Sequence, residues 1–464
     1  MSRTMDEVYQ SALLSGAAYV SLQRQDFLIG TAIADASWSR RALGVESFAG
    51  RGFTHRQFAE VQRRYQVLHH QPDTTSGFSA TLFENTVSGE LHLAFRGTTE
   101  LGEEWREVAL ALEFARQLGA LLRDGVVDDF LRAAGVLDAA GNANPAYIGR
   151  LGLTGHSLGG HLALWTAVDH PELVMGVDTF NGAGMSCSAP VMVLLETLWR
   201  DTILPALSTS SLDPGRVHNF YADPGPQALT TRVFGYRPGE HVSLFIEDRS
   251  GAGAKPLENH AMEYLLESLA LYRVFGALDA SLSFNDVSTI LEGSSNIGDG
   301  SIATTIAALG DALGEEYAGL DDAVALFDAL GPDLAAGAWS GARIKPLSDL
   351  EMSAIARENS LIGSSYRFAL LNFHSFALVA PGAVSSGLAL TGFTSEYIEH
   401  RSFLLESLLL RNRGATQMVA ESGRVPHAPW TMRQAAGAYC ERAGGFRWAS
   451  SPLRNGAAGL TRTR

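Results

Sequence analysis

The amino-acid sequence predicts an α/β sandwich around a mostly parallel sheet, followed by a helical C-terminal extension. Short apolar strand patterns alternate with helical patterns over residues 1–275, which favours parallel strands joined by helices. Residues 276–410 differ in composition, because Ala, Leu and Ser dominate and helical spacing recurs. A chain of 464 residues has room for two or three domains. We therefore expect an α/β domain over 1–275, a mainly helical accessory region over 276–410 and a basic tail over 411–464.

Hydrophobic periodicity predicts the elements of these regions in order. Alternating apolar residues on both sides of the turn Val87–Glu90 predict a β-hairpin, and a long helical pattern follows over residues 103–134. Buried-strand patterns cover residues 151–154, 174–180, 217–221 and 242–246. Helical patterns cover residues 158–168, 261–272, 303–313 and 396–410.

Composition and charge exclude several classes of protein. A formal net charge of -15 excludes binding to a nucleic-acid backbone, so we expect no nucleic-acid partner. The sequence contains no run of about 18 apolar residues, so we expect no integral membrane segment. The two cysteines, Cys187 and Cys440, cannot form a disulfide framework or a cysteine zinc site. We expect no metal and no cofactor.

Both ends of the chain differ from its middle. The first residues carry Asp6 and Glu7 and no long apolar stretch, so we expect no cleaved signal peptide. Cytoplasmic location and export by a non-cleaved C-terminal route both stay open. Residues 411–464 hold nine Arg against two acidic residues and lack periodicity, which predicts a disordered tail. A solvated tail and a shifted reading frame are alternative explanations of its composition.

A glycine-flanked serine lies between a predicted strand and a predicted helix. The segment Gly155-His-Ser157-Leu-Gly159-Gly160 matches the nucleophile elbow, in which a sharp turn lifts a serine hydroxyl out of the sheet. In such a turn the backbone N–H of the residue after the nucleophile, here Leu158, stabilises an oxyanion. We therefore predict Ser157 as the nucleophile. The alternative is a glycine-rich turn without chemistry.

The elbow and an earlier segment together resemble a known family. Phe95-Arg-Gly97-Thr98-Thr99 followed by Trp105, and then the Ser157 elbow, are similar to the class 3 lipases of the α/β-hydrolase fold. The resemblance covers about residues 8–275. It implies hydrolysis of carboxylic esters, usually acylglycerols or phospholipids. It also implies that Thr98 supplies the second oxyanion donor.

A serine nucleophile needs a base, and the base needs an orienting carboxylate. In this fold the acid and then the histidine follow the serine in the chain. His260 lies just before the last amphipathic helix of the domain, where a loop-borne base belongs. Asp223 ends a strand and precedes Pro224, similar to an Asp-x-x-Pro segment of class 3 lipases. Asp178 is the alternative acid. Packing or strand positions are expected for three other histidines, His161, His218 and His241.

The connection between two predicted strands, residues 183–216, is long and apolar. Connections of this kind usually cover a site, so we predict a cap over the nucleophile. Its apolar side chains would line an acyl pocket: Val191, Leu195 and Trp199. A packed crossover helix is the alternative.

Residues 276–410 also resemble a segment that follows lipase-like domains in large secreted bacterial proteins of the RTX type. The similarity includes Tyr366-Arg367-Phe368 and Tyr397-Ile-Glu-His-Arg401. Such proteins continue into calcium-binding glycine–aspartate repeats, and this sequence contains none. The resemblance therefore gives no ground for a calcium site.

The sequence as a whole predicts a serine carboxylic ester hydrolase of lipase or esterase type. The predicted triad is Ser157, Asp223 and His260. A phospholipase A1 or a polyesterase with the same triad is an alternative, and so is an inactive hydrolase fold that serves as a binding module. The expected partner is a lipid or another ester, and action at a lipid–water interface stays open.

Overall fold

The computed structural model describes most of the chain. The described residues are 3–19, 54–72, 74, 77–97, 125–184, 211–223, 237–247, 260–297, 300–347 and 351–409. Several predicted features lie outside them: Thr98, the pocket residues Val191, Leu195 and Trp199, most of the cap, and the tail.

A sheet of seven strands forms the centre of the N-terminal half, with its strands in chain order. The strands are β1 (Tyr65–Gln71), β2 (Ala80–Asn85), β3 (Leu91–Phe95), β4 (Leu151–His156), β5 (Val174–Phe180), β6 (Val217–Asp223) and β7 (Glu240–Phe245). The first three strands are antiparallel neighbours, and β3 to β7 run parallel. The predicted hairpin and mostly parallel sheet are therefore confirmed.

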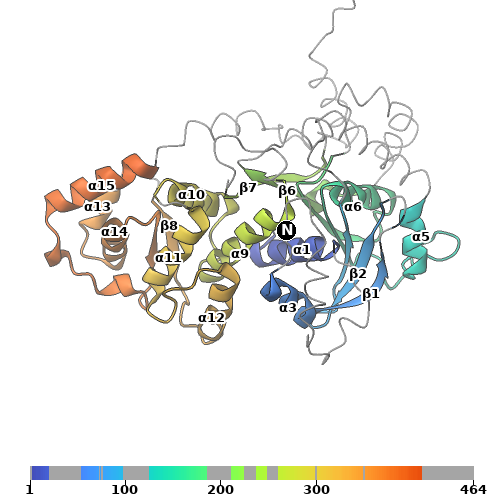
Figure 1. The fold of residues 1–464 in the computed structure, drawn as a ribbon, viewed down its shortest axis with the longest axis horizontal. Helices are drawn as coiled ribbons and strands as arrows, with labels where there is room; N and C mark the ends of the chain where they lie inside the picture. The colour runs from blue at the N-terminus through green and yellow to red at the C-terminus, as the bar shows by residue number, and fades with distance from the viewer. Residues whose placement is uncertain are drawn as a thin grey trace, which may run out of the picture.

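Helices cover both faces of this sheet, so the fold has three layers (Figure 1). On one face α5 (Val126–Ala133) and α6 (Leu158–Asp169) pack on strand residues such as Leu82. On the other face α1 (Met5–Ala17) and α9 (Met262–Leu278) pack on the next residue, Phe83. Because successive strand residues point to opposite faces, each apolar strand contributes to two cores.

The first helix, α1, has no counterpart among the predicted elements. It contacts β3, β4 and β5 on one side and α9 on another, and it is buried along nearly its whole length. A helix that is buried in this way lacks the polar face that makes an amphipathic pattern readable. Its N-terminus is closed by a capping box in which Thr4 and Glu7 exchange hydrogen bonds.

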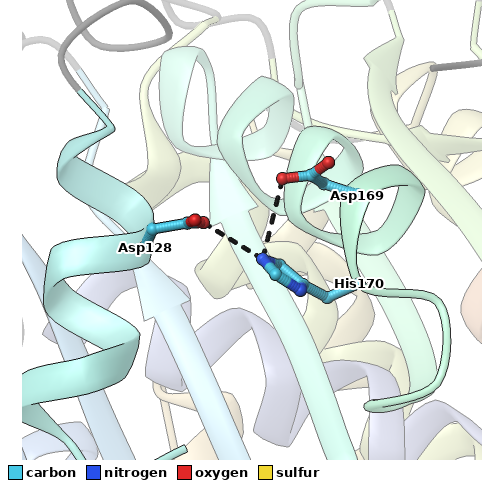
Figure 2. Close-up of side chains that lie close together, drawn as sticks. All are labelled: Asp128, Asp169 and His170. Atoms are coloured by element: carbon cyan, nitrogen blue, oxygen red, sulfur yellow. Dashed lines mark hydrogen bonds and ion pairs between the residues drawn. The ribbon is translucent and has the colours of Figure 1, made fainter. Parts of the chain in front are cut away.

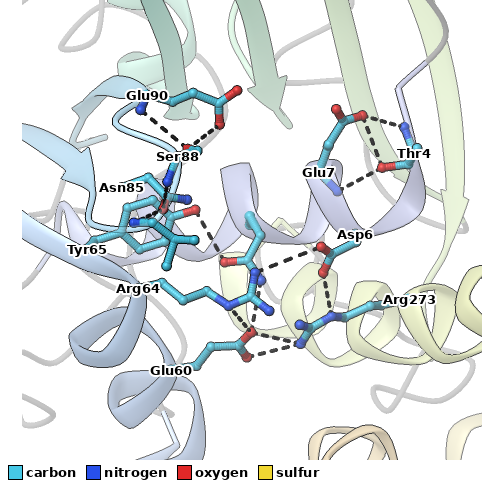
Figure 3. Close-up of polar contacts among 12 residues, drawn as sticks. Thr4, Asp6, Glu7, Glu60, Arg64, Tyr65, Asn85, Ser88, Glu90 and Arg273 are labelled. Carbon is cyan, nitrogen blue, oxygen red and sulfur yellow. Dashed lines mark hydrogen bonds and ion pairs between the residues drawn. The ribbon is translucent and has the colours of Figure 1, made fainter. Parts of the chain in front are cut away.

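A buried ion cluster joins α1 and α9 to α3 (His55–Arg64), as Figure 3 shows. The Arg273 guanidinium lies 2.6 Å from the Asp6 carboxylate and 2.9 Å from the Glu60 carboxylate. Glu60 also accepts a hydrogen bond from Gln10 at 2.9 Å. We call Asp6, Glu60 and Arg273 the helix clamp. Arg273 compensates one of the two carboxylates, and Arg64, 3.4 Å from Glu60 and 3.9 Å from Asp6, compensates the other.

The C-terminal half is mainly helical, as predicted. Its helices are α10 (Phe284–Ser295), α11 (Ser301–Leu313), α12 (Ala323–Ala335), α13 (Met352–Ala356), α14 (Leu361–Asn372) and α15 (Ser395–Leu409). A two-stranded antiparallel sheet joins β8 (Arg343–Pro346) to β9 (Phe376–Val379). Short 3₁₀ turns lie at Val384–Gly387 and Leu390–Gly392, and another, Pro214–Arg216, precedes β6 in the N-terminal half. Within the described ranges, no helix has the length and apolarity needed to cross a bilayer.

One apolar core continues from the sheet into this helical half. Residues of α1 and α9 share it with Leu309 of α11, Leu326 of α12 and Leu378 of β9. The boundary predicted at residue 275 falls near the C-terminal end of α9, and the division into domains stays a prediction.

The helical half contains a buried arginine with a structural role. Arg367 in α14 donates to the carbonyl oxygens of Ala356 at 2.7 Å, Glu358 at 2.8 Å and Leu388 at 2.8 Å. These bonds satisfy backbone carbonyls at the ends of local segments, which would otherwise be buried without donors.

Candidate active site

The predicted nucleophile lies on a strained turn between β4 and α6. Ser157 has φ 55° and ψ -120°, and it is half-buried between fully buried neighbours. Among the described residues, three that are not glycine have positive φ: Ser157, Asn181 and Phe373. Strain of this kind persists only where the surrounding structure enforces it. The backbone therefore has the form that the elbow motif requires.

The glycines of the motif let α6 approach the sheet closely. A Cβ atom on Gly155 would lie 2.2 Å from the Gly159 carbonyl carbon, and one on Gly159 would lie 2.2 Å from the Phe95 oxygen. A Cβ atom on Gly160 would lie 2.7 Å from Gly182 Cα. These contacts are with backbone atoms, which cannot move aside. The spacing of glycines around Ser157 is thus a packing requirement of the turn.

Two backbone segments lie close to Ser157. Leu158 is the first residue of α6, and the first N–H groups of a helix have no partner inside it. The turn after β3 lies alongside, because a Cβ atom on Gly97 would lie 3.2 Å from Ser157 Cβ. The predicted second donor, Thr98, follows Gly97 and lies outside the described residues.

His260 lies beside the elbow, directly before α9. Its backbone carbonyl accepts hydrogen bonds from His156 Nε2 at 2.7 Å and from Asn181 Nδ2 at 3.1 Å. Its ring centroid lies 4.8 Å from that of His156, the residue that precedes Ser157. The two histidines are 104 residues apart in the chain. The fold therefore places His260 next to the residue that precedes Ser157, and its role as the base stays a prediction.

The surroundings of His260 favour a neutral imidazole. Burial lowers the pKa of His260 well below its usual value, and the nearby His156 and Arg237 lower it further. A general base must be unprotonated to accept a proton, so this environment suits that role at neutral pH.

Asp223 is the last residue of β6, at the carboxyl end of the sheet where Ser157 also lies. Its carboxylate accepts a hydrogen bond from Ser243 Oγ at 3.2 Å, and burial raises its pKa. Within the described part of the chain, no hydrogen bond or ion pair joins Asp223 to His260. Its role as the orienting acid stays a prediction.

The alternative acid, Asp178, lies inside the sheet, where other side chains contact its carboxylate. It lies 2.9 Å from the Arg3 guanidinium and 3.3 Å from His218 Nδ1. Although burial alone would raise it, the pKa of the Asp178 carboxyl is lowered by the His218 hydrogen bond and by Arg3. These contacts account for both Asp178 and His218 as structural residues of β5 and β6.

The other two histidines also have packing partners. His161 is buried in α6, where Nδ1 donates to the Gly184 carbonyl at 3.1 Å. His241 Nε2 donates to the Arg237 carbonyl at 3.3 Å. Burial lowers the pKa of His161 to about 4. A neutral, buried ring bonded to a carbonyl agrees with the packing role expected for His161, whereas His241 lies at the exposed start of β7.

One group of possible metal ligands lies at the opposite end of α6 (Figure 2). His170 Nε2 is 3.1 Å from an Asp128 oxygen and 3.6 Å from an Asp169 oxygen. Arg132 lies 3.3 Å from the other Asp128 oxygen. Because a guanidinium already neutralises this carboxylate, the arrangement is that of an ion-pair cluster, and Ser157 lies at the other end of the helix.

Three residues around the elbow are absent from the predicted site. Tyr19, at the end of α1, donates its hydroxyl to His156 Nδ1 at 2.7 Å. Asn181, directly after β5, accepts from the Ala222 N–H at 2.9 Å and donates to His260. His156 is part of the elbow motif and could have been found there, whereas the sequence holds no local signal for the other two.

Comparisons with known proteins bear on this arrangement. Residues 133–212, which include the elbow, match a family model described as "Putative esterase". No curated protein matches the chain. Among solved structures, the lipase of Rhizopus microsporus var. chinensis is similar, with 14% identity over 52% of this chain and 74% of that one and a TM-score of 0.28. Lipase II of Rhizopus niveus has 17% identity over 52% and 80%, with a TM-score of 0.26. The family match supports a carboxylic ester hydrolase.

Proposed function

We propose that this protein is a serine carboxylic ester hydrolase of the lipase or esterase type. The observation that carries the proposal is the half-buried Ser157 on a strained strand-to-helix turn, together with His260, whose ring lies 4.8 Å from that of His156, the residue before Ser157. A serine hydroxyl on such a turn can act as a nucleophile, and a neutral imidazole is the base that it needs.

The reaction follows from the roles of these groups. Ser157 Oγ attacks the ester carbonyl carbon while His260 accepts its proton. The oxyanion is held by the Leu158 N–H and by Thr98, and collapse of the intermediate transfers the proton from His260 to the leaving alcohol. Water then attacks the acyl-enzyme by the same route and releases the acid. Asp223 orients His260 in this scheme.

The substrate class is part of the proposal. Acylglycerol-type and short-chain esters follow from the class 3 lipase resemblance, with phospholipids and polyesters as alternatives for the same triad. The apolar residues Val191, Leu195 and Trp199 would form a wall for the acyl chain. Hydrolysis of p-nitrophenyl esters of increasing chain length, of triglycerides and of phosphatidylcholine would distinguish these substrates.

Labelling by a fluorophosphonate ester tests the nucleophile directly. We expect the wild-type protein and the control Ser88→Ala, which changes an exposed turn serine, to be labelled. The variant Ser157→Ala should not be labelled and should hydrolyse esters at least ~10³-fold more slowly. Near-wild-type turnover by folded Ser157→Ala would contradict the mechanism. A folded wild-type protein that neither reacts nor hydrolyses any ester would instead be an inactive binding module.

A further inference from the structure

We propose that Tyr19, His156 and Asn181 are positioning residues that fix the backbone of His260 relative to Ser157. The inference rests on the proposed function, because it assigns these side chains to the alignment of the base with the nucleophile. We call the three residues the site network. None of them is part of the predicted triad or oxyanion hole.

The hydrogen bonds of His156 determine which of its nitrogens carries the proton. A carbonyl oxygen only accepts, so His156 Nε2 must donate to the His260 carbonyl at 2.7 Å. In the neutral ring Nδ1 is then an acceptor, and the Tyr19 hydroxyl must donate to it at 2.7 Å. Burial lowers the pKa of His156 to about 4, which agrees with a neutral ring.

The Tyr19 hydroxyl extends this connection to the turn after β3. It lies against the backbone of Gly97, the residue before Thr98. The contact is close, because a Cβ atom on Gly97 would meet the hydroxyl oxygen at 2.2 Å. One hydroxyl therefore links the turn that carries the predicted oxyanion donor to the residue before the nucleophile.

Asn181 connects the same carbonyl to the strand that carries the predicted acid. Its Nδ2 donates to the His260 carbonyl at 3.1 Å, and its Oδ1 accepts from Ala222 N–H at 2.9 Å. Its φ of 44° is one that asparagine tolerates better than most residues. Ala222, the residue before Asp223, is therefore connected to His260 through the Asn181 side chain.

The site network is important for the proposed reaction because its hydrogen bonds hold the backbone of His260 in place. Among the described residues, the imidazole of His260 makes no hydrogen bond. The contacts that hold His260 are the two hydrogen bonds accepted by its backbone carbonyl and the His156 ring, whose centroid lies 4.8 Å from its own. Misplacing a catalytic group by about 1 Å can cost ~10²-fold in rate. Loss of the network should therefore lower kcat and leave substrate binding nearly unchanged.

Four variants test the proposal in the full chain with a p-nitrophenyl ester. Tyr19→Phe removes one hydroxyl, and Asn181→Asp removes the donor but keeps an acceptor and a side chain that tolerates positive φ. His156→Phe removes both bonds, whereas His156→Gln retains one donor and one acceptor. We expect kcat to fall roughly 10- to 100-fold in the first three, with KM changed by less than about threefold. His156→Gln should recover much of the loss.

Tyr65→Phe is the matched control, because it removes another buried tyrosine hydroxyl, bonded to Gln10 and outside the network. It should retain wild-type kcat. If wild-type protein is labelled at Ser157 but folded Tyr19→Phe and His156→Phe keep wild-type kcat, the positioning role is wrong and the proposed function stands. If His156→Phe does not fold, Tyr19→Phe decides. An inactive wild-type protein would overturn both proposals.

Discussion

The site network and the helix clamp are both buried polar clusters, but they differ in charge and in what they enclose. The clamp joins Arg273 to two carboxylates, and the neighbouring Arg64 supplies the second positive charge. The site network consists of neutral groups that bond mainly to backbone atoms beside the half-buried Ser157. Charged clusters such as the helix clamp hold secondary-structure elements together. The neutral side chains of the site network can instead position His260 relative to Ser157 without adding a charge of their own. The comparison separates polar residues needed for stability from those expected to serve reactivity.

The largest expected effect separates two aspartates of the sheet, the buried Asp178 and the half-buried Asp223. Asp223→Asn should lower kcat by up to ~10⁴-fold, because in the proposed mechanism the Asp223 carboxylate selects the tautomer of His260. Asp178→Asn should instead lower the free energy of unfolding, because Arg3 and His218 lose a buried carboxylate. Ester hydrolysis and urea denaturation of both variants measure the difference. A worse kcat for Asp178→Asn would reverse the assignment of the acid.

The second prediction removes the centre of the helix clamp. Arg273→Met leaves the buried Glu60 without its main partner and should cost about 3–5 kcal/mol of unfolding free energy. Turnover per folded molecule should stay near wild type. Arg132→Ala is the control, since it breaks an exposed pair worth at most about 1 kcal/mol. Equal destabilisation by the two variants would show that the clamp contributes little.

The third prediction concerns pH and the neutral buried histidines. Burial lowers the pKa of His156 and His161 from 6.5 to about 4, so below pH 6.5 the unfolded chain binds more protons than the folded one. Stability is therefore complete above pH 6.5 and is lost as pH falls towards 4, by up to about 3 kcal/mol for each histidine.

Urea denaturation at several pH values between 7.5 and 4.5 measures this loss. The variant His161→Phe should show a shallower loss than the wild-type protein, because it removes one of these groups. Identical pH profiles for the two proteins would exclude a contribution from His161.

Local patterns predicted those parts of the fold that depend on neighbours in the chain. The hairpin, strands β4 to β7, α6 and the Ser157 turn all follow from periodicity or from glycine spacing. The buried helix α1 and the edge strand β1 were not predicted. The contact between Tyr19 and His156 joins residues 137 positions apart, so it arises only from the tertiary fold. The catalytic roles of His260 and Asp223 stay predictions.

The position of α1 has a consequence for the order in which the protein folds. The buried face of α1 packs against β4 and β5, which follow it in the chain. Glu60 of the clamp can pair with Arg273 only after that residue, 213 positions later, has been made. During synthesis, the apolar side of this helix is therefore exposed until α9 has emerged. Forming contacts of such long sequence separation is slow, and exposed apolar surface promotes aggregation. The helix α1 can therefore dock fully only after α9 has been made, and slower translation of the middle of the gene should lengthen the period of exposure.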